Sequence, residues 1–308
     1  MRYTASANSF LWYLFIPFLV IFYISFLFWS DRNFSNNPVQ EVIIKKQEAV
    51  NSLASIDGII LGGSNAQFGI SAISLNKLSD LTWVNLGIPG EGYSDINYFN
   101  FISNSLNDLK RLDVSFVIYS SSTFLEKSLK NDLSINLFGK KKISYKPQRS
   151  LASYLKSNLG YNKKSTFPIA NAYGDLLFRD NYCDHFSSTP LSYRNYLNEV
   201  DLRIWMPMQL TRISELFPNA KIIITVPNGF YKNEEEGNFD TRNNLLKVVQ
   251  DIFFKHELSD KNSLFLLSQK PYPSSNLMCG DFWHPNEGGR EWRTNQLYEF
   301  INDQLLNK

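Results

Sequence analysis

The chain has 308 residues, of which 44% are hydrophobic and 19% charged, and this composition excludes a disordered protein. The formal net charge of +2 argues against a nucleic-acid-binding protein that relies on a general basic surface. Two cysteines are too few for a disulfide framework or a zinc site of four thiolates, and three histidines leave few candidates for histidine chemistry.

The N-terminal part of the chain predicts a membrane anchor. Residues 10–29 carry no charge, and half of them are aromatic. A helix of twenty residues is about 30 Å long, which matches the hydrocarbon thickness of a bilayer. A cleaved signal peptide is the alternative, but its apolar region would be shorter and followed by small residues. We therefore expect a short tail at 1–9, a transmembrane helix at 10–30 and an extracytoplasmic domain, either periplasmic or at the cell surface.

After a polar stalk at 31–50, the domain at 51–308 alternates short apolar runs with helical patterns. Apolar runs without polar alternation are typical of parallel strands that are covered on both faces. The sequence thus predicts an α/β fold with a central parallel sheet. The expected strands are 58–61, 83–86, 114–119, 221–226 and 263–267, and the expected helices are 71–80, 94–110, 201–217, 240–257 and 286–306.

The segment 125–200 between the third and fourth expected strands is longer than an ordinary crossover and is interpreted as an insertion. Its first part, 125–165, has ten basic and two acidic residues, a net charge of +8. Such a surface suits an anionic polymer or lipid headgroups. A solvated insertion without a partner explains the same composition, and the sequence leaves both interpretations open.

Two turns that follow strands carry groups suited to acyl chemistry. Ligands of open α/β sheets bind outside the carboxyl ends of the strands. Ser64 follows Gly62-Gly63 at a strand-to-helix turn, where its hydroxyl is exposed and its N–H lies near a helix N-terminus. Gly90 follows the second strand and can present a backbone N–H to the same place. Glycines in such a segment also serve tight turns alone.

The most informative segment precedes the last expected helix. Asp281 stands three residues before His284, which is followed by proline and asparagine. The carboxylate can accept a hydrogen bond from the imidazole and fix its tautomer, so that the other ring nitrogen takes a proton from a serine. A capping aspartate and a surface histidine ahead of the helix are the alternative.

Together, Ser64, Gly90 and the late Asp281-x-x-His284 resemble the SGNH (GDSL-type) hydrolase superfamily. The resemblance covers about 56–308, with the insertion outside it. It implies a flavodoxin-like three-layer fold and ester chemistry without metal or cofactor. It also implies that Ser64 is the nucleophile, His284 the general base and Asp281 the orienting carboxylate. The N–H groups of Ser64 and Gly90 would then form the oxyanion hole.

The sequence departs from the family at two places. Gly63 stands where the family usually has an aspartate before the nucleophile, and 119–123 lacks the asparagine that normally follows the third strand. A missing oxyanion donor costs ~10²–10³ in rate. The hydroxyl of Ser122 is the replacement donor that we expect here, with the hydroxyl of Thr123 or the amide of Asn65 as alternatives.

The remaining histidines and the cysteines give weaker signals. His185 and His256 are expected at the surface. Cys183 and Cys279 can form one disulfide if the domain is exported, which would link the insertion to the segment that carries the Asp-x-x-His motif. A metal site built from both cysteines with Asp184 and His185 is the alternative, although its spacing matches no common pattern.

The function that the resemblance implies is that of a membrane-anchored serine esterase or O-acyltransferase, with acetyl as the expected acyl group. The substrate would be an acylated carbohydrate of the cell envelope or surface, and a membrane-bound acyl donor or acyltransferase would be the partner. Two alternatives remain. One is a non-catalytic scaffold that keeps the fold and binds glycan or a membrane acyltransferase; the other is a lipid esterase.

Overall fold

The structure is a computed structural model with two compact units, Met1–Gln40 with Ser144–Ser165 and Glu41–Ile143 with Thr166–Lys308. It describes residues 15–23, 25, 38–88, 98–106, 108–120, 170–176, 183, 199–225, 238–255, 264–267, 275–279 and 284–303.

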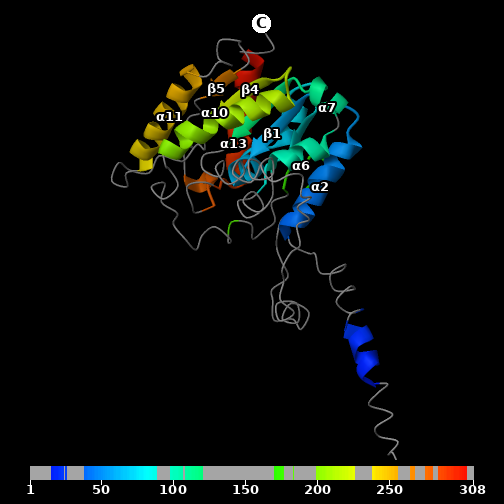
Figure 1. Cartoon of the computed structure of the whole chain (residues 1–308). Helices are drawn as coiled ribbons and strands as arrows, with labels where there is room; N and C mark the ends of the chain where they lie inside the picture. The colour runs from blue at the N-terminus through cyan, green and yellow to red at the C-terminus, as the bar shows by residue number, and fades with distance from the viewer. Residues whose placement is uncertain are drawn as a thin grey trace, which may run out of the picture. The chain divides into compact units, whose positions relative to one another are not determined.

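The expected transmembrane segment is described only in part. Residues 15–23 form a helix with exposed side chains, drawn in dark blue in Figure 1. Within the described ranges, no helix is both long enough and apolar enough to cross a membrane. Most of the expected span at 10–30 lies outside the described residues.

The second unit contains a parallel sheet, as the sequence predicts. Its strands in the described part of the chain are β1 (Gly58–Gly62), β2 (Trp83–Asn85), β3 (Phe116–Ser120), β4 (Lys221–Thr225) and β5 (Leu264–Leu267). All pairings are parallel, and the strand order is β2-β1-β3-β4-β5. This is the order of flavodoxin-like folds. The predictions of an α/β class and a central parallel sheet are therefore confirmed.

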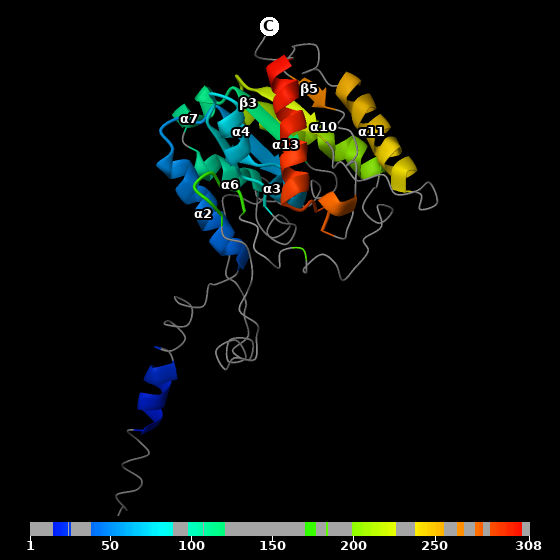
Figure 2. The ribbon, with the colours of Figure 1, turned by 180° about the vertical axis from the view of Figure 1, so that it is seen from behind.

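Helices cover both faces of this sheet. Figure 1 shows α10 (Glu199–Leu216) and α11 (Asn238–Lys255) side by side across one face, while Figure 2 shows α4 (Ala72–Leu78) and α13 (Glu287–Ile301) on the opposite face. The last three expected helices correspond to α10, α11 and α13. The expectation of one helix over 94–110 is wrong, because α6 (Tyr98–Ser105) and α7 (Asp108–Asp113) occupy that range. A short helix, α3 (Ser64–Gly69), precedes α4; the sequence predicts a helix N-terminus near Ser64 but gives no range for this helix.

The hydrophobic core on the α4 and α13 face is built around an aromatic pair. The rings of Trp83 and Phe116 stack with centroids 6.0 Å apart. Burial of such apolar side chains is the main source of stability, at roughly 25 cal/mol per Å². The other buried members of this cluster are Ile60, Ala66, Ile70, Ala72, Leu75, Ile118, Ile223, Leu297 and Ile301.

The described part of the segment expected as a stalk is helical. α2 (Pro38–Ser52) has three buried apolar side chains, Val42, Ala49 and Val50. Val42 belongs to a second core cluster with Phe68, Ala170, Leu176 and Cys279, against which Cys183 packs. This helix therefore packs near the turn that carries Ser64.

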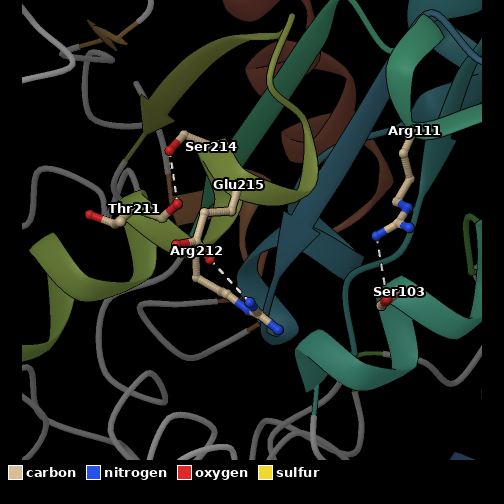
Figure 3. Close-up of polar contacts among 6 residues, drawn as sticks. All are labelled: Ser103, Arg111, Thr211, Arg212, Ser214 and Glu215. Atoms are coloured by element: carbon tan, nitrogen blue, oxygen red, sulfur yellow. Dashed lines mark hydrogen bonds and ion pairs between the residues drawn. The ribbon is translucent and has the colours of Figure 1, made fainter. Parts of the chain in front are cut away.

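Figure 3 shows polar contacts within α10 and between α6 and α7. An exposed ion pair such as that of Arg212 with Glu215 contributes less than about 1 kcal/mol. The contacts drawn are Arg212 Nη1 to Glu215 Oε2 at 3.0 Å, Ser214 Oγ to Thr211 O at 2.8 Å, and Arg111 Nη1 to Ser103 Oγ at 3.4 Å.

Candidate active site

Ser64 lies where β1 ends and α3 begins, at the carboxyl edge of the sheet. In the stretch 58–72 it is the only residue that is not fully buried. The chain around it is thus fixed in the core, while the hydroxyl-bearing residue reaches the surface. A rigid, accessible hydroxyl at a strand end is what a serine nucleophile requires.

The backbone just before this turn is held by two close contacts. Gly62 has φ +137°, and a Cβ at this position would lie 1.9 Å from the carbonyl oxygen of Ser120 at the end of β3. The Gly62 N–H donates to Tyr98 Oη at 2.9 Å, and the phenol donates in turn to Leu86 O at 3.0 Å. Burial raises the pKa of Tyr98. The phenol therefore stays protonated, and it can bridge the ends of β1 and β2.

Asn85, the last residue of β2, fixes the neighbouring turns. Its Nδ2 donates to Ala66 O at 3.1 Å and to Ile70 O at 2.9 Å, and its Oδ1 accepts from Gly87 N at 2.9 Å. A single buried carboxamide thus joins α3 to the turn after β2. Gly90, the expected oxyanion donor on that turn, lies outside the described residues.

His284 packs against the helix that begins with Ser64. Its side chain is nearly buried, and its ring meets the ring of Phe68 edge-on, with centroids 5.6 Å apart and planes at 74°. Phe68 is four residues after Ser64, so the two side chains lie on the same face of α3. The structure therefore brings His284 to the helix that begins with Ser64. Asp281 and Ser122 lie outside the described residues.

Cys183 and Cys279 form a disulfide, which confirms one of the two alternatives for these residues. The alternative metal site is wrong, because both sulfurs are used in this bond. Cys279 N also donates to the carbonyl oxygen of His284 at 2.9 Å. The disulfide is thereby coupled to the segment that carries the histidine. Across the described residues, no group of three or more His, Cys, Asp or Glu side chains is placed to hold a metal ion.

Arg293 is a buried residue of the site that the sequence analysis missed. Only 1% of it is exposed. Its Nη1 donates to Asn65 O at 3.1 Å and its Nη2 donates to Ser120 Oγ at 2.7 Å. Arg293 belongs to α13, whose N-cap residue Asn286 follows His284 by two positions. His284 thus lies two residues before the N-cap of α13, and the Arg293 guanidinium of the same helix contacts the residue that follows Ser64.

A buried lysine supports the same edge of the sheet from α2. Lys46 is fully buried, and its Nζ donates to Asn85 O and to Gly174 O, both at 2.7 Å. Gly174 has φ +78°, and a Cβ there would lie 2.3 Å from Asn85 O, so only glycine fits this approach. Burial lowers the pKa of Lys46 to about 7, and the negative charge of Asp175 opposes this shift.

Asp175 connects this lysine to α4. The carboxylate is 1% exposed and accepts three hydrogen bonds at the start of that helix. The donors are Ser71 Oγ at 3.1 Å, Ala72 N at 2.8 Å and Ile73 N at 2.9 Å. Residues 170–176, which fall within the expected insertion, are therefore part of the support of the site.

Raising the pH from 7 to 9 is expected to stabilise the wild-type protein by about 2 kcal/mol more than it stabilises Lys46→Met. The folded-state pKa of about 7 lies below the ordinary value of 10.5. Between these two values the unfolded chain binds a proton that the folded protein does not, so the free energy of unfolding rises with pH. Urea unfolding of both proteins across this range measures the difference. If the free energy of unfolding changes equally with pH in the two proteins, the prediction is wrong.

Comparisons with known proteins give structural similarity only. No model of a known protein family and no characterised protein matches the sequence. Two structures of a family two carbohydrate esterase from Clostridium thermocellum are similar to this chain, each with 12% sequence identity. The structure of an active-site mutant gives a TM-score of 0.43, and the structure in complex with cellohexaose gives a TM-score of 0.42. The acetyl xylan esterase Est2A from Butyrivibrio proteoclasticus is 10% identical, with a TM-score of 0.43. Each similarity covers 82% of this chain but only 65–66% of the other, so the chain spans just under two thirds of their length.

Proposed function

We propose that this protein is a serine esterase or O-acyltransferase that acts on acylated carbohydrate. The observation that carries the proposal is the packing of His284 on Phe68, one turn along the helix that begins with Ser64. Ser64 is the nucleophile, His284 the general base and Asp281 the carboxylate that orients the imidazole. The carbohydrate substrate is the class that the resemblance to SGNH hydrolases implies.

The reaction proceeds through an acyl-enzyme. His284 takes the proton of the Ser64 hydroxyl while Oγ forms a bond to the acyl carbon. The ester C–O bond then breaks, and the leaving alcohol receives the proton from the imidazolium. Water or a sugar hydroxyl next attacks the acyl carbon and gives its proton to His284, and Ser64 leaves as the protonated hydroxyl. Hydrolase and transferase differ only in this second acceptor.

The proposal places the catalytic domain outside the cytoplasm, held at the membrane by residues 10–30. The Cys183–Cys279 bond supports this placement, because disulfides form and persist in oxidising compartments. An enzyme anchored there lies close to a membrane-bound acyl donor, to a membrane acyltransferase and to envelope polysaccharide. Exclusion of water from the acyl-enzyme would favour transfer over hydrolysis.

A non-catalytic scaffold is the second candidate. It is favoured by Gly63, which stands where the related enzymes usually have an aspartate, and by the lack of asparagine at 119–123. A scaffold of this kind would bind glycan or a membrane acyltransferase without turning over an ester.

A fluorophosphonate probe applied to the full chain with its disulfide intact tests the proposal. The wild-type protein and Ser214→Ala, which alters an exposed serine on α10, are expected to be labelled equally. Ser64→Ala is expected to lose the label, and His284→Ala to react far more slowly. Release of acetate from acetylated glycan, but not of fatty acid from phospholipid vesicles, then separates a carbohydrate esterase from a lipid esterase. A folded wild-type protein that takes no label would favour the scaffold.

A further inference from the structure

The side chain of Asn65, which directly follows Ser64, is buried with its oxygen unpaired within the described part of the chain. Only 4% of Asn65 is exposed, and its Oδ1 has no hydrogen-bond partner among the described residues. Leaving a buried polar atom unpaired costs free energy, so native proteins rarely do so without a reason. A ligand that pairs with this amide would supply the reason.

The main chain of Asn65, in contrast, is firmly held. Its carbonyl oxygen accepts a 3.1 Å hydrogen bond from Nη1 of Arg293. The other terminal nitrogen of that guanidinium binds Ser120 at the end of β3. A buried guanidinium therefore fixes the main chain of Asn65 beside the proposed nucleophile, while the side-chain oxygen of Asn65 is left without a partner among the described residues.

Two other polar side chains described at this edge, those of Asn85 and Ser120, are already occupied. The side-chain Nδ2 and Oδ1 atoms of Asn85 make three hydrogen bonds, all with backbone groups. Ser120 Oγ, at the strand end where related enzymes supply a carboxamide, accepts from Arg293. Asn65 is thus the carboxamide that remains available within one residue of Ser64.

We propose that Asn65 is a substrate-binding residue whose Nδ2–H donates a hydrogen bond to the carbonyl oxygen of the acyl group and to the oxyanion that forms on it. A half-turn about χ2 lets a carboxamide present either its oxygen or its NH₂ group. Asn65 then takes the place of the asparagine that 119–123 lacks. This inference rests on the proposed function and names a third donor for the same site.

Replacement of Asn65 by alanine tests the inference. We expect kcat to fall ~10²–10³-fold, the usual cost of one lost oxyanion donor, with little change in KM. The melting temperature should stay the same or rise, because the substitution removes an unpaired buried oxygen. Asn65→Asp keeps the shape but has no N–H to donate, so it should lose kcat as well. A residue with a purely structural role would lower stability and activity together.

Gln67 provides a matched control on the same helix. It is fully buried, and neither Nε2 nor Oε1 has a hydrogen-bond partner among the described residues. Gln67→Leu should raise the melting temperature and leave kcat unchanged. This contrast separates the effect of removing a buried unpaired amide from the effect of removing a donor to the substrate.

The outcomes separate this inference from the proposed function. If the wild-type protein takes no fluorophosphonate label, the proposed function fails. If it is labelled but Asn65→Ala keeps its kcat, Asn65 does not contact the acyl group and the inference is overturned. The inference is also overturned if both Asn65 variants melt more than about 5 °C below wild type, a shift that corresponds to a structural role.

Discussion

Loss of the Cys183–Cys279 disulfide is expected to lower the free energy of unfolding by about 3–5 kcal/mol. The two cysteines are 96 residues apart in the sequence, so the bond closes a long loop and removes much of the conformational entropy of the unfolded chain. Urea unfolding of the wild-type protein with and without reductant, and of Cys183→Ala, measures the loss.

A double-mutant cycle separates the bond from the packing of the two side chains. Either single alanine variant already removes the disulfide, so the double variant should lose little more than each single one. If the double variant instead loses as much unfolding free energy as the two single variants together, packing within the second core cluster, and not the bond, provides the stability. Insensitivity of wild-type unfolding to reductant would contradict the prediction directly.

The same variants should also lower kcat. The N–H of Cys279 donates to the carbonyl oxygen of His284, so the disulfide restrains the segment that ends at this proposed general base. A base displaced by about 1 Å can cost ~10²-fold in rate. An activity equal to wild type at a temperature where the variant is fully folded would show that the bond stabilises the fold but does not position His284.

Strands were easier to predict than helices, for a physical reason. β1 and β3 are buried at every residue, so each appears in the sequence as a short apolar run, such as 58–61 for β1. α3 has only six residues, too few for a helical period, and five of them are buried, so no polar face marks it. The break between α6 and α7 falls inside one continuous helical pattern.

The sequence indicates the candidate catalytic residues, but it does not indicate the buried residues that hold the neighbouring backbone in place. Ser64 and His284 stand in short motifs whose spacing relates directly to acyl chemistry. Arg293 and Lys46 look like ordinary surface residues, because their partners are distant in the chain. Arg293 binds the carbonyl of Asn65, 228 residues away, and Lys46 binds that of Gly174, 128 residues away. Only the folded chain shows that these cations are buried.

Asp175→Ala is expected to destabilise the protein by about 3–5 kcal/mol, because three donors at the start of α4 lose their shared acceptor, at about 1–3 kcal/mol each. Ser71→Ala, which deletes only one of those donors, is the matched control and should cost about 1 kcal/mol. Urea unfolding at neutral pH compares the three proteins.

The double variant Lys46→Met/Asp175→Asn tests whether the electrostatic interaction between Asp175 and Lys46 contributes to stability. Lys46→Met removes the cation that faces the buried Asp175 carboxylate, and Asp175→Asn removes the charge that favours the protonated form of Lys46, whereas the double substitution removes both groups. The double variant should therefore lose less stability than the two single variants together. In Asp175→Asn, the pKa of Lys46 should fall further, because the charge that raises it is gone. Strictly additive losses would show that the two groups act independently, Asp175 as a helix cap and Lys46 as a donor to β2.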